Sequence, residues 1–325
     1  MKYDPRKFDL AENYIFEGEG DIEPYLFSED IAIAVDVAFA TKRPLLISGK
    51  PGSGKSRLAE AVAALKKWHF LSKTMTSRTR LEELTVELDH LRRLHDAHSG
   101  NGGQNGDGSA MKPDWAYHNP GLFWWALNHE SAKYRGDDRQ AEAEAMGLAI
   151  DFPGTFRKQE NNTHHTVLLI DEIDKAEPDL PNDLLEPLDR KAFGLPDGSK
   201  IMAEDGVSIL TIITTNGERE LPQAFLRRCV SLKLEEPKKR DLIRIARKHY
   251  PDADEARITT IAEKMETFRE EAKKSFRRPP STSEFLDAVR VCEDLEIAID
   301  DSKDSVWKKV ENSVLLKKSN DNDQA

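Results

Sequence analysis

Eight residues near the start of the chain have the types and spacing needed to bind a phosphate group. Gly49-Lys50-Pro51-Gly52-Ser53-Gly54-Lys55-Ser56 fits the pattern G-x-x-x-x-G-K-[ST] without a mismatch. Glycines let successive backbone N–H groups turn toward phosphate oxygens. Lys55 would reach the β- and γ-phosphates, and the Ser56 hydroxyl would bind Mg²⁺. We call these residues the P-loop and predict that they bind ATP. The predicted nucleotide contacts are Gly49, Pro51, Gly52, Ser53, Gly54, Lys55, Ser56 and Arg57.

The flanking residues support this prediction over a chance glycine-rich turn. The apolar run 44–48 before the P-loop reads as a buried strand. Residues 57–65 after it are strong helix formers with helical spacing. A helix that starts at the loop would direct its positive N-terminal end toward the phosphates.

A second group of chemical interest is a pair of carboxylates after four apolar residues. Residues 167–170 are typical of a central strand buried on both faces, and Asp171 and Glu172 follow directly. Ligands of such sheets bind at the carboxyl ends of the strands. We expect Asp171 to hold Mg²⁺ and Glu172 to orient the attacking water. The simpler alternative is a strand that ends in a solvated turn.

Two further segments offer polar groups for the same chemistry. Residues 208–215 are apolar and β-branched and predict another core strand, which ends at Asn216. Asn216 is either a turn residue or a ligand of the water or the γ-phosphate. The predicted helix 221–229 carries Arg227 and Arg228 near its end. These arginines either complement the helix dipole or serve as an arginine finger in a neighbouring subunit's site.

The elements around these residues predict an α/β domain followed by a small helical domain. We expect an N-terminal arm at 1–27, the α/β domain at 28–236, a helical lid at 237–300, and a helix with a polar tail at 301–325. Further expected elements are a helix over 28–41, a strand over 70–76, a helix over 180–188 and a hairpin-like excursion over 193–207. The lid helices are expected over 238–249, 254–274 and 281–299, the last with Ser281 as its N-cap.

The region between the P-loop and the carboxylate pair is harder to interpret. A leucine stripe predicts one helix over 79–97, and residues 99–109 predict a flexible loop. His90, His95 and His98 lack the spacing of a helical zinc site, so we expect them to be solvent-exposed. Trp124 and Trp125 could be core residues or a partner-binding surface. Residues 131–163 are expected to form a weakly structured surface excursion.

Composition narrows the function classes. The chain has 325 residues and a net charge of −11, which disfavours general nucleic-acid binding. Cys229 and Cys292 have no metal-ligand spacing and are expected to be reduced and structural. The start has no apolar signal core, and the longest apolar stretch, 31–40, contains Asp36. We therefore expect a cytoplasmic protein without membrane insertion.

The order of the motifs resembles that of AAA+ ATPases, and within them the MoxR-type branch. The stretch 170–176 is similar to that branch's Walker B segment, and 221–228 is similar to its finger segment, with Arg228 at the finger position. The resemblance covers residues 28–299. It implies a hexameric ring that uses ATP and Mg²⁺ to remodel or activate a client protein, often one with a von Willebrand factor A domain. The stretch 216–222 and the tryptophan pair are similar to those of subgroups found in bacterial conflict or defence operons.

One position departs from the resemblance. The third lid helix of this family usually starts near an arginine that senses the γ-phosphate, whereas this chain has Ser281-Thr282-Ser283-Glu284 there. Arg277 or Arg278 could replace that arginine from just upstream.

The sequence thus predicts a chaperone-like ring ATPase in which Lys55, Glu172, Asn216 and Arg228 (or Arg227) act in catalysis. Two alternatives remain at this stage: a nucleotide-switched scaffold with little hydrolysis, and a nucleic-acid-associated AAA+ motor. The intact Glu172 argues against the first, and the acidic charge argues against the second.

Overall fold

The structure is a computed structural model that describes residues 15–101, 112–159, 163–275, 278–300, 302 and 305–316. Most of the predicted N-terminal arm, most of the predicted loop 99–109 and the end of the predicted tail lie outside these residues. Arg277 also lies outside them. Among the described residues, no helix is both long and apolar enough to cross a membrane.

A five-stranded parallel sheet forms the centre of the fold, with the strand order β11-β3-β10-β7-β4. β7 pairs in parallel with β10 on one side and with β4 on the other. Its residues Thr166 to Ile170 are buried, as expected for a strand covered on both faces. The strands are β3 (Leu45–Ser48), β4 (His69–Thr74), β7 (Thr166–Asp171), β10 (Ile209–Thr215) and β11 (Val230–Lys233). The predicted α/β fold with a parallel sheet is confirmed.

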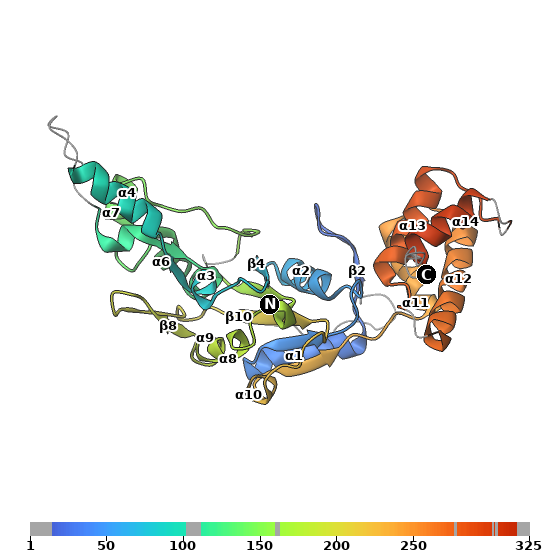
Figure 1. Cartoon of the computed structure of the whole chain (residues 1–325), viewed down its shortest axis with the longest axis horizontal. Helices are drawn as coiled ribbons and strands as arrows, with labels where there is room; N and C mark the ends of the chain where they lie inside the picture. Colours follow the sequence, from blue (N-terminus) through green and yellow to red (C-terminus); the bar gives the residue numbers. More distant parts are fainter. Residues whose placement is uncertain are drawn as a thin grey trace, which may run out of the picture. The chain divides into compact units, whose positions relative to one another are not determined.

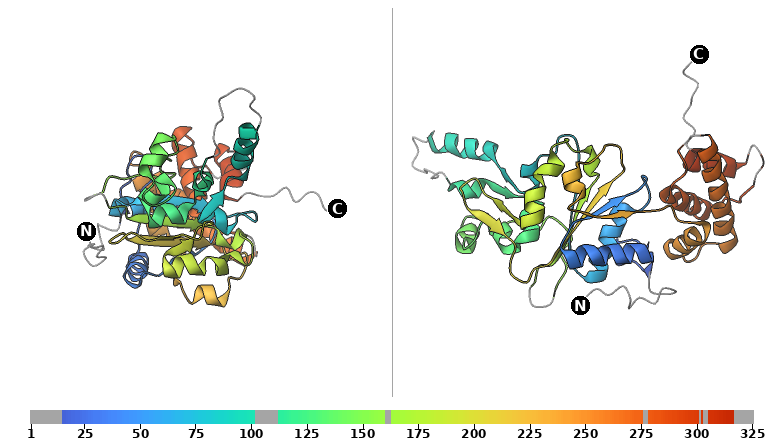
Figure 2. Two further views of the ribbon diagram at one scale, coloured as in Figure 1. Left: turned by 90° about the vertical axis from the view of Figure 1, so that its left-hand side faces the viewer. Right: turned by 90° about the horizontal axis from the view of Figure 1, so that it is seen from below.

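Helices cover the sheet on both faces (Figures 1 and 2). The short helix α5 (Leu122–Leu127) packs on β4 and β7. Its apolar side chains join one core with Leu168, Ile170 and Ile213 of the sheet. The other helices of this part are α1 (Glu29–Thr41), α2 (Lys55–Lys66), α8 (Leu180–Asp183), α9 (Leu185–Arg190) and α10 (Gln223–Leu226).

The single helix predicted over 79–97 was wrong. The chain forms α3 (Leu81–Leu84), β5 (Val86–Leu88) and α4 (His90–Asn101), and β5 pairs antiparallel with β6 (His118–Pro120). This pairing with a distant segment overrides the local helical pattern. Leu91 and Leu94 of the expected apolar stripe are 82% and 56% exposed. The stripe therefore does not mark a buried helix face.

The two tryptophans belong to the core, which overturns the alternative of a partner-binding surface. Trp124 is 0% and Trp125 is 2% exposed. The indole N–H of Trp124 donates to Ser131 Oγ at 3.1 Å, so its polar group is satisfied inside the protein.

The segment after the tryptophans is more ordered than the sequence predicted. It forms α6 (His129–Tyr134) and α7 (Gln140–Ala145). The buried guanidinium of Arg135 ties the segment together, because it donates to the carbonyl oxygens of His118 and Leu148. The prediction of weak structure was wrong for this part, because the composition does not reveal that Arg135 is buried.

The chain divides into two compact units, each described here by itself. The first contains Ala34–Leu46 and Val62–Ser231. The second contains the described residues of 15–33, 47–61 and 232–316, and therefore the P-loop. The domain boundaries predicted from the sequence stay a prediction.

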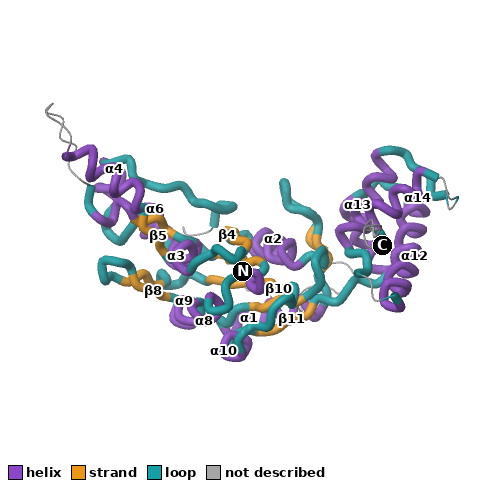
Figure 3. Tube along the Cα trace, viewed as in Figure 1, coloured by secondary structure: helices purple, strands orange, loops and turns teal. Residues whose placement is uncertain are grey.

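The helical end of the chain has a core of its own. Helix α12 packs on α11 and α13, and Phe285, Met265 and Trp307 are fully buried between the helices. The elements are α11 (Lys239–His249), α12 (Glu255–Lys274), α13 (Thr282–Asp294), α14 (Val306–Val310) and the one-turn η5 (Glu311–Leu315). The three predicted lid helices are present, and the third ends at Asp294, earlier than expected. Figure 3 shows α12, α13 and α14 as helices. Two small hairpins complete the fold: β1 (Ile15–Phe16) with β2 (Tyr25–Leu26), and β8 (Ala192–Gly194) with β9 (Lys200–Met202).

Candidate nucleotide site

The P-loop lies between β3 and the first turn of α2, as its mechanism requires. Gly52 and Gly54 have φ of +75° and +88°, a conformation that strains residues with a side chain. A Cβ at Gly52 would lie 2.6 Å from Ser281 Oγ, so space as well as backbone conformation requires glycine there.

The groups inside the loop are suited to an anion. Lys55 is buried, and its Nζ donates to the carbonyl oxygens of Gly49 (2.8 Å) and Lys50 (3.1 Å). The buried Ser53 hydroxyl has no hydrogen-bond partner, which is unusual for a buried polar group. An ammonium group, an unpaired hydroxyl and a curled backbone fit the phosphates of a nucleotide.

Arg57 has carboxylate partners of its own. Its guanidinium pairs with Glu60 at 2.9 Å and with Glu23 at 3.4 Å. The hydrogen bond that Arg57 donates to Glu60 is the main cause of its raised pKa. Its predicted contact with the nucleotide stays a prediction.

The start of α13 lies against the P-loop. Ser281 caps this helix, and Glu284 completes a capping box by accepting from the Ser281 N–H at 2.7 Å. Ser283 Oγ donates to Gly52 O at 3.4 Å. Arg278 pairs with the buried carboxylate of Glu284 at 3.2 Å. The position expected for a sensing arginine thus presents hydroxyl groups, with Arg278 nearby.

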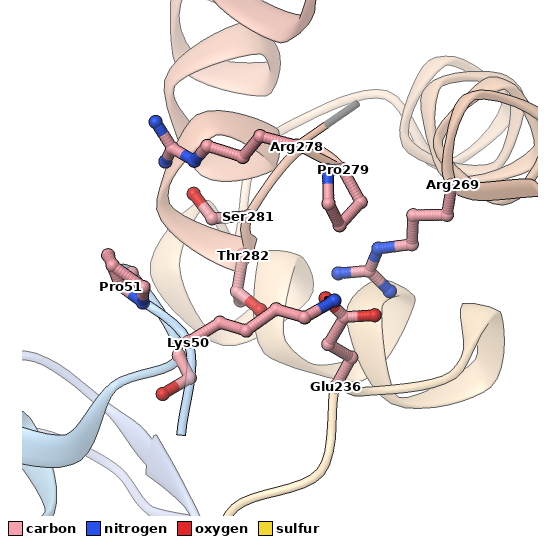
Figure 4. Close-up of a pocket in the computed structure, with 10 residues that line it drawn as sticks. Lys50, Pro51, Glu236, Arg269, Arg278, Pro279, Ser281 and Thr282 are labelled. Atoms are coloured by element: carbon pink, nitrogen blue, oxygen red, sulfur yellow. Dashed lines mark hydrogen bonds and ion pairs between the residues drawn. The ribbon is translucent and has the colours of Figure 1, made fainter. Parts of the chain in front are cut away.

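A pocket next to the P-loop contains an arginine that sequence reasoning missed (Figure 4). Arg269 is 7% exposed, and it donates to the carbonyl oxygens of Pro237 and Pro280. Its Nη2 has no partner, and burial lowers its pKa. Lys50 and Glu236 of the same pocket form an ion pair at 2.8 Å. An arginine in the middle of an amphipathic helix gives no sequence signal that separates it from a solvated one.

The register of β7 and β10 brings the predicted acidic residues next to the end of β10. Ile213 stands opposite Ile170, so the ends of both strands lie side by side. Thr214 Oγ1 donates to Asp171 Oδ1 at 2.5 Å and accepts from the Glu172 N–H at 2.9 Å. Thr214 was not predicted as a site residue, because a threonine in a β-branched strand is indistinguishable from a core residue.

Glu172 is held from two sides. Asn216 Nδ2 donates to its Oε1 at 2.9 Å, and Lys175 Nζ donates to its Oε2 at 2.8 Å. The bond from Lys175, followed by that from Asn216, lowers the pKa of Glu172, so the carboxylate is ionised at neutral pH. Its backbone has φ of +58°, which is uncommon for a residue with a side chain. Two predicted site residues, Glu172 and Asn216, are therefore in direct contact, and their roles in catalysis stay predictions.

Asp174 anchors this arrangement and was also missed. It is 3% exposed, and its Oδ2 accepts from the backbone N–H groups of Asn216 (3.1 Å) and Glu218 (2.9 Å). Asp174, Glu172 and Lys175 line one open pocket with residues 74–77 at the carboxyl ends of the strands. The spacing of Asp171 and Asp174 is the only sequence signal that could have suggested it.

The predicted finger arginines are both exposed. Arg228 Nε donates to Asp189 Oδ2 at 2.5 Å, and its Nη1 donates to Ala224 O at 3.1 Å. The backbone of the segment is held by Arg43, whose guanidinium donates to the carbonyl oxygens of Arg227, Arg228 and Cys229. The bond to Ala224 agrees with the simpler explanation that a cation complements the helix end. Exposure of the side chain leaves it accessible to another molecule.

The first unit therefore contains Asp171, Glu172, Asn216 and Arg228, and the second contains the P-loop with the start of α13. A family model described as AAA domain (dynein-related subfamily) matches residues 128–229, which include all four of the first group. This match and the five-stranded parallel sheet define an α/β P-loop NTPase fold. They support an AAA+ ATPase as the class of this protein. No curated protein matches the chain.

Proposed function

We propose that this protein hydrolyses ATP to ADP and phosphate in a ring of subunits. The observation that carries the proposal is the ionised Glu172 held by Asn216 beside Asp171, at the strand ends of a chain that also carries a complete P-loop. An ionised carboxylate at this place can act as the general base that activates a water molecule.

Each residue has a defined part in this chemistry. The P-loop backbone and Lys55 would bind the phosphates, and Ser56 and Asp171 are the proposed ligands of Mg²⁺, which would neutralise phosphate charge. Glu172 orients and polarises the attacking water, and Asn216 fixes the carboxylate in place. Because Lys175 occupies the second oxygen of Glu172, it competes with water for the same carboxylate.

We infer that Arg228 acts on the ATP of a neighbouring subunit. An arginine supplied from outside the site stabilises the charge of the transition state and is worth ~10³–10⁵ in rate. Arg228 is exposed, and Arg43 fixes its backbone, so the side chain projects from a rigid segment. A closed ring gives every site an arginine, and a hexamer is the form that the resemblance to AAA+ ATPases implies.

The work done with ATP is proposed to be the remodelling or activation of a protein client, as in MoxR-type AAA+ proteins. A client with a von Willebrand factor A domain and a role in bacterial defence follow from the resemblance of the motifs. The net charge of −11 supports a protein client over a nucleic acid. Stimulation of turnover by such a domain, and not by duplex DNA, is the expected result.

The test is ATP turnover measured against protein concentration, with mass measured alongside. We expect turnover per subunit to rise as oligomers form, and Glu172→Gln to abolish it while ATP still binds. Arg228→Ala should lose turnover and keep ATP binding, and mixing it with Lys55→Ala should restore part of the activity. Arg227→Ala tests the other candidate: if it loses turnover and Arg228→Ala keeps it, Arg227 is the finger.

Two outcomes would contradict the proposal. Oligomers that bind ATP without turnover, with or without a client, would indicate a nucleotide-switched scaffold. Turnover that depends on DNA would indicate a nucleic-acid motor.

A further inference from the structure

Three histidines that are far apart in the sequence meet inside the first unit. His69 begins β4, His129 begins α6, and His164 lies just before β7. Each offers a ring nitrogen, and these nitrogens all lie within 4.8 Å of one another. In the part of the chain that the structure describes, no other group of three or more histidine, cysteine or acidic residues is placed closely enough to hold a metal ion.

The spacing of the nitrogens suits a tetrahedral metal ion. His69 Nε2 and His164 Nδ1 are 3.1 Å apart. Two nitrogens bound to Zn²⁺ at 2.0–2.1 Å in tetrahedral geometry are separated by about 3.3 Å. The ring of His129 stacks on that of His164 with centroids 4.1 Å apart, which places a third nitrogen next to this pair.

The third histidine has an unsatisfied polar atom. His129 is 7% exposed, and its Nδ1 is buried without a hydrogen-bond partner. Burial of an unpaired polar atom is unfavourable by about 1–3 kcal/mol, so such atoms are rare unless they have a ligand. This orphaned nitrogen is a second observation, independent of the spacing, that points to a ligand at this place.

The surroundings keep the histidines neutral, which is the form that binds metal. Phe156 stacks on His69, and Phe152 stacks on His129. Burial lowers the pKa of His69 to about 4 and that of His129 to about 3. The charged groups that act on the cluster are Glu130 and Lys133, which have opposite effects on the pKa of His164. A metal ion would therefore compete with few protons at neutral pH.

We propose that His69, His129 and His164 bind one divalent transition-metal ion of the Zn²⁺ class, at a site separate from the residues assigned to Mg²⁺. Imidazole ligands favour such ions, whereas Mg²⁺ prefers oxygen ligands. Three histidines leave the fourth tetrahedral position for water or another small ligand.

Metal binding requires two local changes that can be observed. His69 Nδ1 accepts from the Arg157 N–H at 3.0 Å, so Nε2 carries the proton and donates it to His164. Ligation through Nε2 moves that proton to Nδ1, and no proton is released. The Arg157 N–H then loses its acceptor and has to turn away. The rings of His129 and His164 must also splay from their parallel arrangement, in which the interplanar angle is 7°.

The experiment uses the full chain without a histidine tag, freed of metal with a chelator and kept in excess Mg²⁺. Zn²⁺ affinity is measured by competition with a chromophoric chelator, and Co²⁺ is used as a coloured substitute for Zn²⁺. We expect one Zn²⁺ per chain and the strong visible absorption of tetrahedral Co²⁺. His129→Phe, which keeps an aromatic ring in the cluster, should weaken Zn²⁺ binding at least ~100-fold, because even the loss of an outer partner of a ligand weakens binding 10–100-fold.

The control variant is His95→Ala, since the His95 side chain is 79% exposed and lies outside the cluster. It should bind Zn²⁺ as the original chain does. Equal affinity in the original chain and His129→Phe, loss of binding in His95→Ala, or the absence of a one-to-one site would overturn the proposal.

A measurement on the unmodified chain covers the case in which His129→Phe does not fold. Nitrogen-15 spectra report the protonated nitrogen of each histidine and the amide of Arg157. On addition of Zn²⁺ the proton of His69 should move from Nε2 to Nδ1, and the Arg157 amide should shift. Unchanged His69 and Arg157 signals at saturating Zn²⁺ would also overturn the proposal.

Discussion

At the scale of single residues, the state of Glu172 is set by two neighbours of different kinds. Asn216 is neutral and comes from the adjacent strand, whereas Lys175 is charged and lies three residues along the chain. Lys175 is 42% exposed, so this ion pair is weak and can open. Lys175 thus restrains a carboxylate that Asn216 positions.

Removal of Lys175 is expected to raise basal ATP turnover. An exposed ion pair is worth about 0–1 kcal/mol, so Lys175→Met should increase the rate by up to about fivefold. It should also raise the pKa of Glu172 toward its ordinary value, because the bond from Lys175 is the main cause of the lowered pKa. The measurement is steady-state turnover as a function of pH.

Arg190→Met is the matched control for Lys175→Met. It removes an exposed ion pair with Glu186 on α9, away from the carboxylates at the strand ends. Its turnover should not change. A slower Lys175→Met variant would indicate that Lys175 contributes to the reaction instead of restraining it.

The buried histidines predict that the fold loses stability in mild acid. His69 has its pKa lowered from 6.5 to about 4 by burial and by the neighbouring histidines. Above pH 6.5 it is neutral in both the folded and the unfolded chain. As the pH falls from 6.5 to 4, only the unfolded chain takes up the proton, so the free energy of unfolding decreases. The loss is up to about 3 kcal/mol for this residue.

The measurement is denaturant unfolding between pH 7 and pH 4 in the presence of a chelator, so that no metal contributes. His69→Phe should reduce the pH dependence, while His95→Ala should leave it unchanged. A free energy of unfolding that stays constant over this range would contradict the burial of His69 in the folded state.

At the scale of elements, the contact between the P-loop and α13 depends on the absence of a side chain at Gly52. Gly52→Ala adds a Cβ in the left-handed region, which costs roughly 1–2 kcal/mol, and places it against Ser281. We expect it to displace the start of α13 and to weaken ATP binding. The measurements are the dissociation constant of ATP and the free energy of unfolding.

Gly206→Ala separates backbone strain from the collision. Gly206 has φ of +81°, and a Cβ there would meet nothing within 4 Å. It should lose a similar amount of stability while ATP binding is unchanged. If both variants bound ATP equally well, the contact of Gly52 with Ser281 would have no part in nucleotide binding.

The elements also show what the sequence can and cannot reveal. The strands that end at Asp171 and Asn216 were predictable, because a run of buried apolar residues is a local signal. The helix expected over 79–97 was not correct, because β5 is defined by its pairing with β6, about 30 residues away. Local periodicity contains no information about such a partner.

The candidate site follows the same division. Lys55, Asp171 and Glu172 were proposed as site residues from motifs with fixed spacing, and their roles stay predictions. Thr214, Asp174 and Arg269 were not, because their importance comes from hydrogen bonds to distant residues. The histidine cluster was missed for the same reason. His69, His129 and His164 are close only in space, whereas His90, His95 and His98 are close in the sequence.

At the scale of the whole molecule, the net charge of −11 affects assembly. Copies of an acidic chain repel one another, and the repulsion acts over about 30 Å at 0.01 M salt but only about 8 Å at 0.15 M. We expect the mass of the ATP-bound protein to increase over this range of salt concentration at a fixed protein concentration. The measurement is sedimentation of Glu172→Gln with ATP, which prevents hydrolysis during the run.

The opposite result is equally informative. Assemblies that dissociate as salt is added would indicate that attraction between opposite charges dominates the interface, and Arg228 and Asp189 would then be the first residues to test.

The pairing of β7 with β10 has one more consequence. Thr214 reaches Asp171, and Asn216 reaches Glu172, only in the register in which Ile213 stands opposite Ile170. A slip by one residue would turn every side chain of β10 to the other face and separate both pairs. If the proposed roles of these residues are correct, a chain with a mispaired sheet would not hydrolyse ATP, and a newly made subunit would gain this activity only when its central sheet is correctly paired.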